Sequence, residues 1–480
     1  MLWRDLAPIQ DAVRAGGVTE ATFAQYVTRT HEENRRRVRE GDLDHLVSYL
    51  LQSTQITPAP AIEPALSAKR LVESMNATSR AAFLRGEAVA APAVPGEVTG
   101  RIAALLKAIA APRDDARLVY FGSLVDAAFP DRRTRQAGLA AEYLRVMRFL
   151  YQKEFVAQQQ AAPAAAVAEL YRHRGLSTDT AVEAGYVVQL GLGVLKGLDP
   201  GRRVRRVLIV GPGLDLAPRT GLQESAAPES YQPWAVIDAI LSLGLGRLAE
   251  LEVVAADINP RVVTHLRETA AHPPTLHLLT SLHEGPALTL SRDYVEYVDR
   301  FGAALAAGSI TPARPVAQGL RAKTVPVAGT AARVLRAEAL DIVTERLDGA
   351  PFDLVIATNI LPYFDDTQLA LALANITSML APGGVFVHNE QRPILGELAA
   401  ALGIPLQQSR HAVIATVSGA KAPLYDSVFL HVRTREGAFD RGGAAQARVE
   451  AQIVLGEGRR RSSRHRASDT ATPAPVVSTR

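Results

Sequence analysis

The spacing of apolar residues divides the chain into a helical first half and a second half of alternating strands and helices. Over residues 21–40 and 138–160, apolar side chains recur at helical spacing with charges between them. Breaks rich in Pro and Ala separate the helical segments, at residues 57–65, 88–97 and 161–166. We therefore expect a mostly α-helical N-terminal region over residues 1–200, which could serve as a cap or substrate domain.

From residue 201 onward, short apolar runs alternate with amphipathic helices, a pattern typical of a largely parallel sheet covered on both faces. The expected strands are residues 204–210, 251–257, 332–338, 352–358, 383–389, 410–417 and 427–433. The link between the last two strands is too short for a crossover helix, so these strands should pair antiparallel. The sequence thus predicts an α/β fold: a doubly wound, seven-stranded Rossmann-like sheet with an antiparallel last strand.

This α/β domain should extend over residues 201–436, with an insertion at about 275–330 between its second helix and its third strand. In the insertion, Tyr294, Tyr297 and Phe301 are spaced for one helical face, which fits core packing and a substrate lid equally well. Residues 437–480 are rich in Gly, Ala, Arg and Ser, and we expect a disordered basic tail there.

Charge and composition exclude several classes of partner. The formal net charge is +4, yet residues 459–480 contain six Arg and one Asp, so the rest of the chain is close to neutral. A basic face for nucleic acid is therefore not expected, apart from weak contacts of the tail. The chain has no cysteine, which excludes disulfides and thiolate metal sites. No signal peptide and no run of about 18 apolar residues is found, so we expect a cytoplasmic protein without a membrane partner.

Two motifs at strand ends indicate a nucleoside cofactor. The turn Gly211-Pro212-Gly213 follows a buried strand, and such a turn lets backbone amides approach a ligand closely, although it also fits an ordinary turn. The next strand ends at Asp257, whose carboxylate is placed to accept hydrogen bonds from two ribose hydroxyls. The alternative role for Asp257 is to cap the following helix.

These motifs, together with the run FDLVIATNILPYF and the turn LAPGGVFVHNE, resemble the ordered motifs of class I S-adenosylmethionine (SAM)-dependent methyltransferases. The resemblance covers residues 204–433, and the run from 352 is most similar to the chemotaxis-receptor glutamate methyltransferases. It implies SAM as cofactor, with Gly211, Pro212 and Gly213 at its methionine and ribose portions and Asp257 at the ribose. It further implies Ile258 against the adenine, Glu338 at the adenine amino group, Asn359 beside the sulfonium and Tyr363 near the substrate entrance.

A general base is needed only if the methyl acceptor must lose a proton. The candidates at strand ends are Tyr363, His388 and Glu390, although strand alternation could equally point His388 into the packing. The segment around His173 and Arg174 fits either a cover over the cofactor or a plain loop between helices. The scattered histidines show no metal-ligand spacing, so no metal is expected.

The fold does not name the methyl acceptor, which we expect to be an oxygen or nitrogen of a small molecule or protein. Three alternatives stay open. One is a chemotaxis-like carboxylate methyltransferase, although the helical half is long for that family. Another is a non-catalytic protein that senses a ligand or binds a partner, favoured by Ile209 where the family has an acid. The third is a nicotinamide-dependent dehydrogenase, against which the segment from Asn359 to Phe364 argues.

Overall fold

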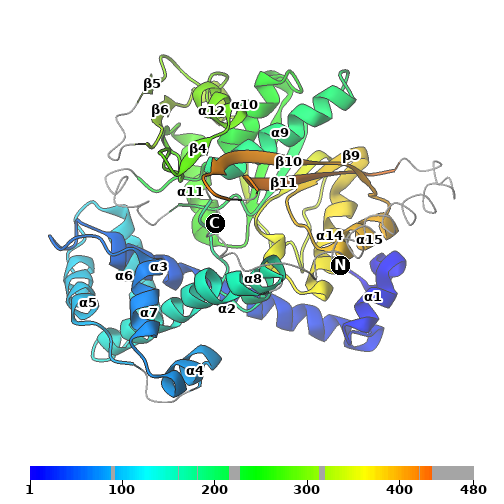
Figure 1. Ribbon diagram of the computed structural model, residues 1–480. Coiled ribbons are helices and arrows are strands. Elements are labelled where there is room, and N and C mark those ends of the chain that lie inside the picture. Colours follow the sequence, from blue (N-terminus) through cyan, green and yellow to red (C-terminus); the bar gives the residue numbers. More distant parts are fainter. Residues whose placement is uncertain are drawn as a thin grey trace.

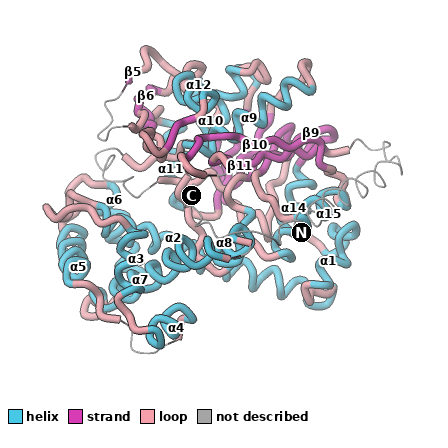
Figure 2. Tube along the Cα trace, viewed as in Figure 1, coloured by secondary structure: helices cyan, strands magenta, loops and turns pink. Residues whose placement is uncertain are grey.

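The computed structural model shows an α/β half built around one large sheet and a helical half beside it (Figures 1 and 2). It describes residues 1–87, 92–160, 162–180, 182–215, 227–312, 319–420 and 422–434. The basic tail predicted for residues 437–480 lies outside these residues. Within the described part of the chain, no helix is both long enough and apolar enough to span a membrane.

The large sheet confirms the predicted fold class. Its strands are β1 (Arg206–Val210), β2 (Glu252–Asp257), β4 (Leu288–Leu290), β7 (Leu335–Ala339), β8 (Phe352–Ala357), β9 (Leu380–His388), β10 (Leu406–Val417) and β11 (Leu424–Val432). They lie in the order β4-β10-β11-β9-β8-β1-β2-β7. The pairs of β1 with β2 and β8, of β2 with β7 and of β8 with β9 are parallel, whereas β11 pairs antiparallel with β9 and β10. The strand order reverses at β1, which makes the ends of β1 and β8 the place where a ligand is expected.

Along each strand, alternate side chains are buried on opposite faces of the sheet. Val207 and Ile209 of β1 belong to one core, and Leu208 and Val210 belong to the other. The first core includes the helices α9 (Val182–Leu198), α10 (Gln232–Ser242) and α11 (Pro260–Ala271). The second includes the N-terminal elements η1 (Trp3–Ile9) and α1 (Gln10–Ala15), with α14 (Asp366–Met379) and α15 (Pro393–Ala401). The beginning of the chain is thus part of the core of the α/β half.

The remaining helices form the helical half. They are α2 (Glu20–Gln52), α3 (Pro64–Glu73), α4 (Ala77–Arg85), α5 (Gly96–Ile109), α6 (Ala116–Ala128), α7 (Arg135–Tyr151) and α8 (Pro163–Arg172). The long helix α2 extends from the α1 end of the molecule to the group of α3, α5, α6 and α7 (Figure 1). Phe23, near its start, lies in the core beneath the sheet, whereas Leu46 and Leu50 lie in the core of the helical half. Helix α2 therefore connects the two halves along its length.

The insertion adds structure that the sequence did not specify. Its strands β3 (Thr275–Leu279), β5 (Thr311–Pro312) and β6 (Ala322–Pro326) form a small antiparallel sheet, while β4 adds an eighth strand to the large sheet beside β10. Helix α12 (Arg292–Arg300) carries Tyr294 and Tyr297, which with Phe301 are buried against Tyr186 of α9 and Tyr231. These three aromatic residues are core residues, so the alternative of a substrate lid is not supported. A short helix, α13 (Gly329–Ala332), leads into β7.

Candidate functional site

The glycine turn lies at the carboxyl end of β1 in a backbone conformation that favours glycine. Gly211 and Gly213 have φ angles of 65° and 76°. A Cβ on Gly211 would overlap the side chain of Ile360, and one on Gly213 would overlap the carbonyl oxygen of Thr178. Because these glycines have no side chain, the turn packs closely against the segments that contain Ile360 and Thr178.

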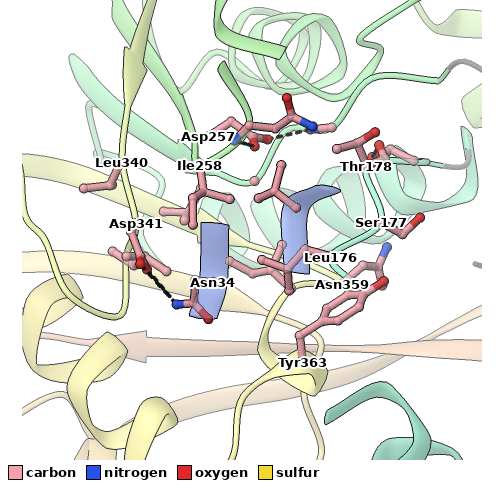
Figure 3. A pocket seen from close by; sticks show the side chains of 18 of the residues that line it. Asn34, Leu176, Ser177, Thr178, Asp257, Ile258, Leu340, Asp341, Asn359 and Tyr363 are labelled. Carbon is pink, nitrogen blue, oxygen red and sulfur yellow. Dashed lines mark hydrogen bonds between the residues drawn. The ribbon is translucent and has the colours of Figure 1, made fainter. Parts of the chain in front are cut away.

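A pocket opens beside this turn at the carboxyl edge of the sheet (Figure 3). Its empty volume is about 710 Å³, part of which is open to solvent. The pocket is lined by Asn34, Val38, residues 176–180, Val210, Gly211, Gly213, residues 257–259, residues 340–342, residues 358–360, Tyr363 and Phe364. It is thus formed by the ends of β1, β2, β7 and β8 together with α2 and the segment between α8 and α9.

Asp257 is held in a buried position at the end of β2. The Asn259 backbone N–H donates to its Oδ1 at 2.8 Å, and that of Gly213 donates to its Oδ2 at 3.4 Å. Burial raises the pKa of Asp257 to about 6, and this effect outweighs the two hydrogen bonds, which lower the pKa. The carboxylate therefore joins the glycine turn to the end of β2 and faces the pocket that both line. Its predicted alternative role, capping α11, belongs to Asn259, whose Oδ1 accepts from the Arg261 N–H at 3.0 Å.

Asn359 follows β8 in a left-handed conformation, with a φ angle of 62°. Its backbone N–H donates to Asn389 Oδ1 at 2.9 Å, and its Oδ1 accepts from Asn389 Nδ2 at 2.6 Å. Asn389 Nδ2 also donates to Asp426 Oδ2 at 3.0 Å. A strained backbone of this kind persists only where its surroundings hold it, and such residues cluster at binding sites. Asn389, which follows β9, is the residue that holds Asn359 at the pocket.

Tyr363 forms part of the pocket wall. Its ring makes an edge contact with Tyr171, with centroids 5.3 Å apart, and its carbonyl oxygen accepts from Arg37 Nη1 at 3.1 Å. Burial raises the pKa of Tyr363 to about 12. The phenol is therefore protonated at neutral pH, and it is a poor proton acceptor.

Helix α2 supplies the opposite wall. Asn34 and Val38 line the pocket, and Asn34 Nδ2 donates to both carboxylate oxygens of Asp341 at 3.2 and 3.1 Å. Gly41, one turn further along, lies so close to the carbonyl oxygen of Leu176 that a Cβ would overlap it. Asp42 follows, and its Oδ1 accepts from Asn259 Nδ2 at 3.0 Å. One polar face of α2 is thus buried against pocket-lining residues of the sheet.

Several predicted residues meet at this pocket. They are Gly211, Gly213, Asp257, Ile258, Asn359 and Tyr363. Pro212 lies in the same turn, and its carbonyl oxygen accepts from Thr180 Oγ1 at 3.2 Å. The segment after Arg174 also takes part, since residues 176–180 line the pocket. His173 itself is exposed and pairs with Glu169.

Glu338 is not brought to the pocket. It lies within β7, and its carboxylate is 3.8 Å from Arg267 and 3.7 Å from Arg336, on the partly exposed side of the strand. Asp341, three residues on, follows the end of the strand and lines the pocket instead. Burial raises the pKa of Asp341. The acidic side chain at this wall of the pocket is therefore that of Asp341, which follows the strand, and not that of Glu338 within it.

His388 and Glu390 also lie outside the pocket. His388 is fully buried between Phe386 and Phe429, and this burial holds its pKa well below the usual range. The oxygens of Glu390 are held by the backbone N–H groups of Gln391 and Arg392 and by the Arg392 side chain. The strand alternation that points His388 into the packing is therefore the correct alternative, and neither residue is placed to act as a base.

Two acidic residues, Glu224 and Glu229, follow the glycine turn in the sequence. Glu229 accepts from the backbone N–H and the ring of His277, at 2.7 and 2.9 Å, and does not line the pocket. Glu224 lies outside the described residues. Among the described residues, no group of three or more His, Asp or Glu side chains could hold a metal ion.

Comparison with known proteins gives a likeness in structure only. No family model and no curated protein matches the chain. Among solved structures, TrmN from Thermus thermophilus is 15% identical with a TM-score of 0.26, and the match spans about half of each protein, 51% of this chain and 48% of that one. The N-methyltransferase NodS from Bradyrhizobium japonicum WM9 is 13% identical with a TM-score of 0.25, covering 53% of this chain and 96% of NodS.

Magnesium protoporphyrin IX methyltransferase from Synechocystis PCC 6803, solved with bound SAM, is 9% identical with a TM-score of 0.27. That match covers 53% of this chain and 82% of the methyltransferase. About half of the chain is therefore distantly similar in structure to SAM-dependent methyltransferases, and the likeness assigns no role to any residue.

Proposed function

We propose that this protein is a SAM-dependent methyltransferase that acts on an oxygen or nitrogen of a small molecule or protein. The observation that carries the proposal is the meeting of the glycine turn, the buried carboxylate of Asp257 and the strained Asn359 at one pocket. This pocket lies where the strand order reverses, which is where open α/β sheets bind nucleotide-like ligands.

The residues present fit SAM. Gly211 and Gly213 of the turn line the pocket, and Asp257 offers a buried acceptor for ribose hydroxyls. Apolar side chains of Ile258, Leu340 and Ile342 line the same pocket and suit the faces of an adenine ring. Asp341 replaces Glu338 as the acid available to the adenine amino group. Asn359 would lie beside the sulfonium.

The bound cofactor supplies an activated methyl group for in-line displacement. The protein then has to hold the acceptor in line with that methyl group, an orientation effect that can contribute roughly 7–11 kcal/mol. Tyr363, as a protonated phenol in the wall, can hold an acceptor by hydrogen bonding. Neither His388 nor Glu390 reaches the pocket, so we assign the removal of an acceptor proton to neither.

The placement of His388 and Glu390 also favours a second candidate, a protein that binds SAM without transferring its methyl group. The similarity of the run from residue 352 to chemotaxis-receptor methyltransferases stays a prediction from sequence. Release of S-adenosylhomocysteine during incubation with a panel of acceptors would support catalysis. Saturable SAM binding with no turnover on any acceptor class would favour the binding protein.

The first experiment is calorimetric titration with SAM and, separately, with NADH and NADPH. The expected result is saturable binding of SAM alone, lost in Asp257→Ala and retained in Glu338→Ala, since Glu338 lies outside the pocket. Circular dichroism and thermal unfolding establish that both variants are folded. Failure of the folded wild-type protein to bind SAM would overturn the proposal, and binding of a nicotinamide cofactor would replace it with a dehydrogenase.

A further inference from the structure

Asn34 of α2 presents a buried amide to the pocket, beside Asp341 (Figure 3). The residue is 1% exposed, and its Nδ2 donates to both carboxylate oxygens of Asp341 at 3.2 and 3.1 Å. Its Oδ1 is buried as well, and among the described residues this oxygen has no hydrogen-bond partner. Buried polar atoms in folded proteins nearly always have a partner, and a bound ligand is one way to supply it. The pocket wall from the helical half thus holds an acceptor that a ligand can satisfy.

The carboxylate of Asp341 fixes the orientation of this amide. An ionised carboxylate only accepts hydrogen bonds, so the NH₂ end of Asn34 has to face it, because a rotated amide would bring two acceptors together. The Val343 N–H donates to Oδ1 of the same carboxylate at 3.1 Å, and the ring of His31 lies 3.4 Å from its Oδ2. Asp341 therefore keeps the Oδ1 of Asn34 turned away from itself, as an acceptor only.

The position of Asn34 corresponds to the base of the proposed cofactor. Asp341, which holds Asn34, lies between Leu340 and Ile342, two of the apolar side chains that suit the faces of an adenine ring. Strand β7, which precedes them, pairs with β2, whose end carries Asp257 for the ribose. A ligand donor that reaches Asn34 therefore comes from the base, and the 6-amino group is the hydrogen-bond donor of adenine.

We propose that Asn34 Oδ1 accepts a hydrogen bond from the 6-amino group of SAM and thereby makes the site selective for adenine. The amino group has two hydrogens, so the second is available to Asp341. A purine with a 6-oxo group would place an acceptor against the acceptor of Asn34 and leave both without a partner. The inference rests on the proposed function and deepens it, because it assigns recognition of the base to the helical half.

Two ligands that differ at position 6 of the purine provide the test. S-adenosylhomocysteine carries the 6-amino group, whereas S-inosylhomocysteine carries a 6-oxo group there and a hydrogen on N1. Calorimetry would measure both ligands on the wild-type protein and on Asn34→Ala. We expect the wild type to bind S-adenosylhomocysteine at least tenfold more tightly than S-inosylhomocysteine, and this ratio to fall about tenfold in Asn34→Ala.

Asn375 of α14 provides a matched control. It is also 1% exposed, and its Oδ1 likewise has no partner among the described residues. Its Nδ2 donates to the carbonyl oxygens of Ile342 and Val343 at 2.9 and 3.3 Å, yet Asn375 does not line the pocket. Asn375→Ala therefore disturbs the same wall from outside. We expect this variant to lose stability and to keep the wild-type ratio between the two ligands.

The ratio separates recognition of the base from a structural role. Equal affinity of the wild type for the two ligands overturns the inference while the proposed function stands. Weakening of both ligands by the same factor in Asn34→Ala also overturns it, because Asn34 would then only shape the wall. Failure of the wild-type protein to bind SAM and S-adenosylhomocysteine refutes the proposed function itself. If Asn34→Ala does not fold, Asn34→Ser provides the same comparison.

Discussion

Replacement of Gly213 by alanine tests whether the pocket depends on the contact between the two halves. The new Cβ would overlap the carbonyl oxygen of Thr178 and the hydroxyl of Thr180, so the segment 176–180 must move off the turn. Gly244 provides a matched control, because it also has a positive φ angle, 62°, but has no atom within 4 Å of its Cβ position. Both substitutions carry the cost of a left-handed alanine, about 1–2 kcal/mol, and only Gly213→Ala disturbs the segment.

The size of the effect follows from the bonds that the movement breaks. The segment is fastened to the turn by the hydrogen bonds of Thr178 to Leu214 and of Thr180 to Pro212. At a net value of about 1 kcal/mol for each such bond, their loss weakens the docked arrangement by about 3 kcal/mol. Since the pocket exists only in the docked arrangement, affinity for SAM should fall by up to about 100-fold.

The assay is calorimetric titration of both variants with SAM, beside urea unfolding of each. We expect Gly244→Ala to lose stability and to keep its affinity, and Gly213→Ala to lose both. Equal affinities in the two variants would refute the claim that the segment from the helical half completes the pocket. If both variants bind SAM more weakly than the wild type by the same factor, backbone strain, rather than the contact with Thr178, explains the loss of affinity.

Three further predictions concern single residues of the site. Burial raises the pKa of Asp257 from 3.8 to about 6. The protonated carboxyl therefore adds to the free energy of unfolding below pH 4, and this contribution is lost as the pH rises through 6. Urea unfolding should therefore show the wild type gaining about 2 kcal/mol relative to Asp257→Asn between pH 7 and pH 4.5, and a constant difference would contradict this pKa. Asn389→Ala removes both bonds that hold Asn359 at a φ angle of 62°, so affinity for SAM should fall about tenfold; unchanged affinity would show that Asn359 needs no such support. His388→Leu leaves the Glu390 N–H without its 3.1 Å acceptor and should lower the free energy of unfolding by about 1–3 kcal/mol, with no change in affinity for SAM. A large loss of affinity for SAM in a folded His388→Leu protein would show that His388 contributes to the binding site.

The parts of the site that could be predicted from the sequence are those whose signals are local. A buried strand followed by Gly211 and Gly213, and a second strand that ends in Asp257, each occupy a few consecutive residues. Parallel strands place their carboxyl ends at one edge, so these signals are enough to bring the residues together. The antiparallel pairing of β10 and β11 follows in the same way from the shortness of their link.

The contribution of α2 could not be predicted in that way. Asn34, Asp42 and His45 are polar residues on a helix, a pattern that in sequence alone indicates a solvated face. They are buried because their partners come from distant segments: Asp42 bonds to Asn259, 217 residues away. The placement of Glu338 outside the pocket could not be predicted for a different reason. It depends on where β7 ends, and strand ends are the least certain part of a sequence-based prediction.

The hydrogen bond between Asn34 and Asp341 also constrains how the protein is made. The two residues are 307 positions apart in the chain. At about 5–20 residues per second, a ribosome adds Asp341 roughly 15–60 s after Asn34. Until Asn259 is added, the polar face of α2 has none of its partners from the sheet and remains hydrated, and Asn34 waits longer still, until Asp341 is added. We therefore expect the helical core to form first during synthesis and the pocket to be completed last, when β7 and β8 join the sheet.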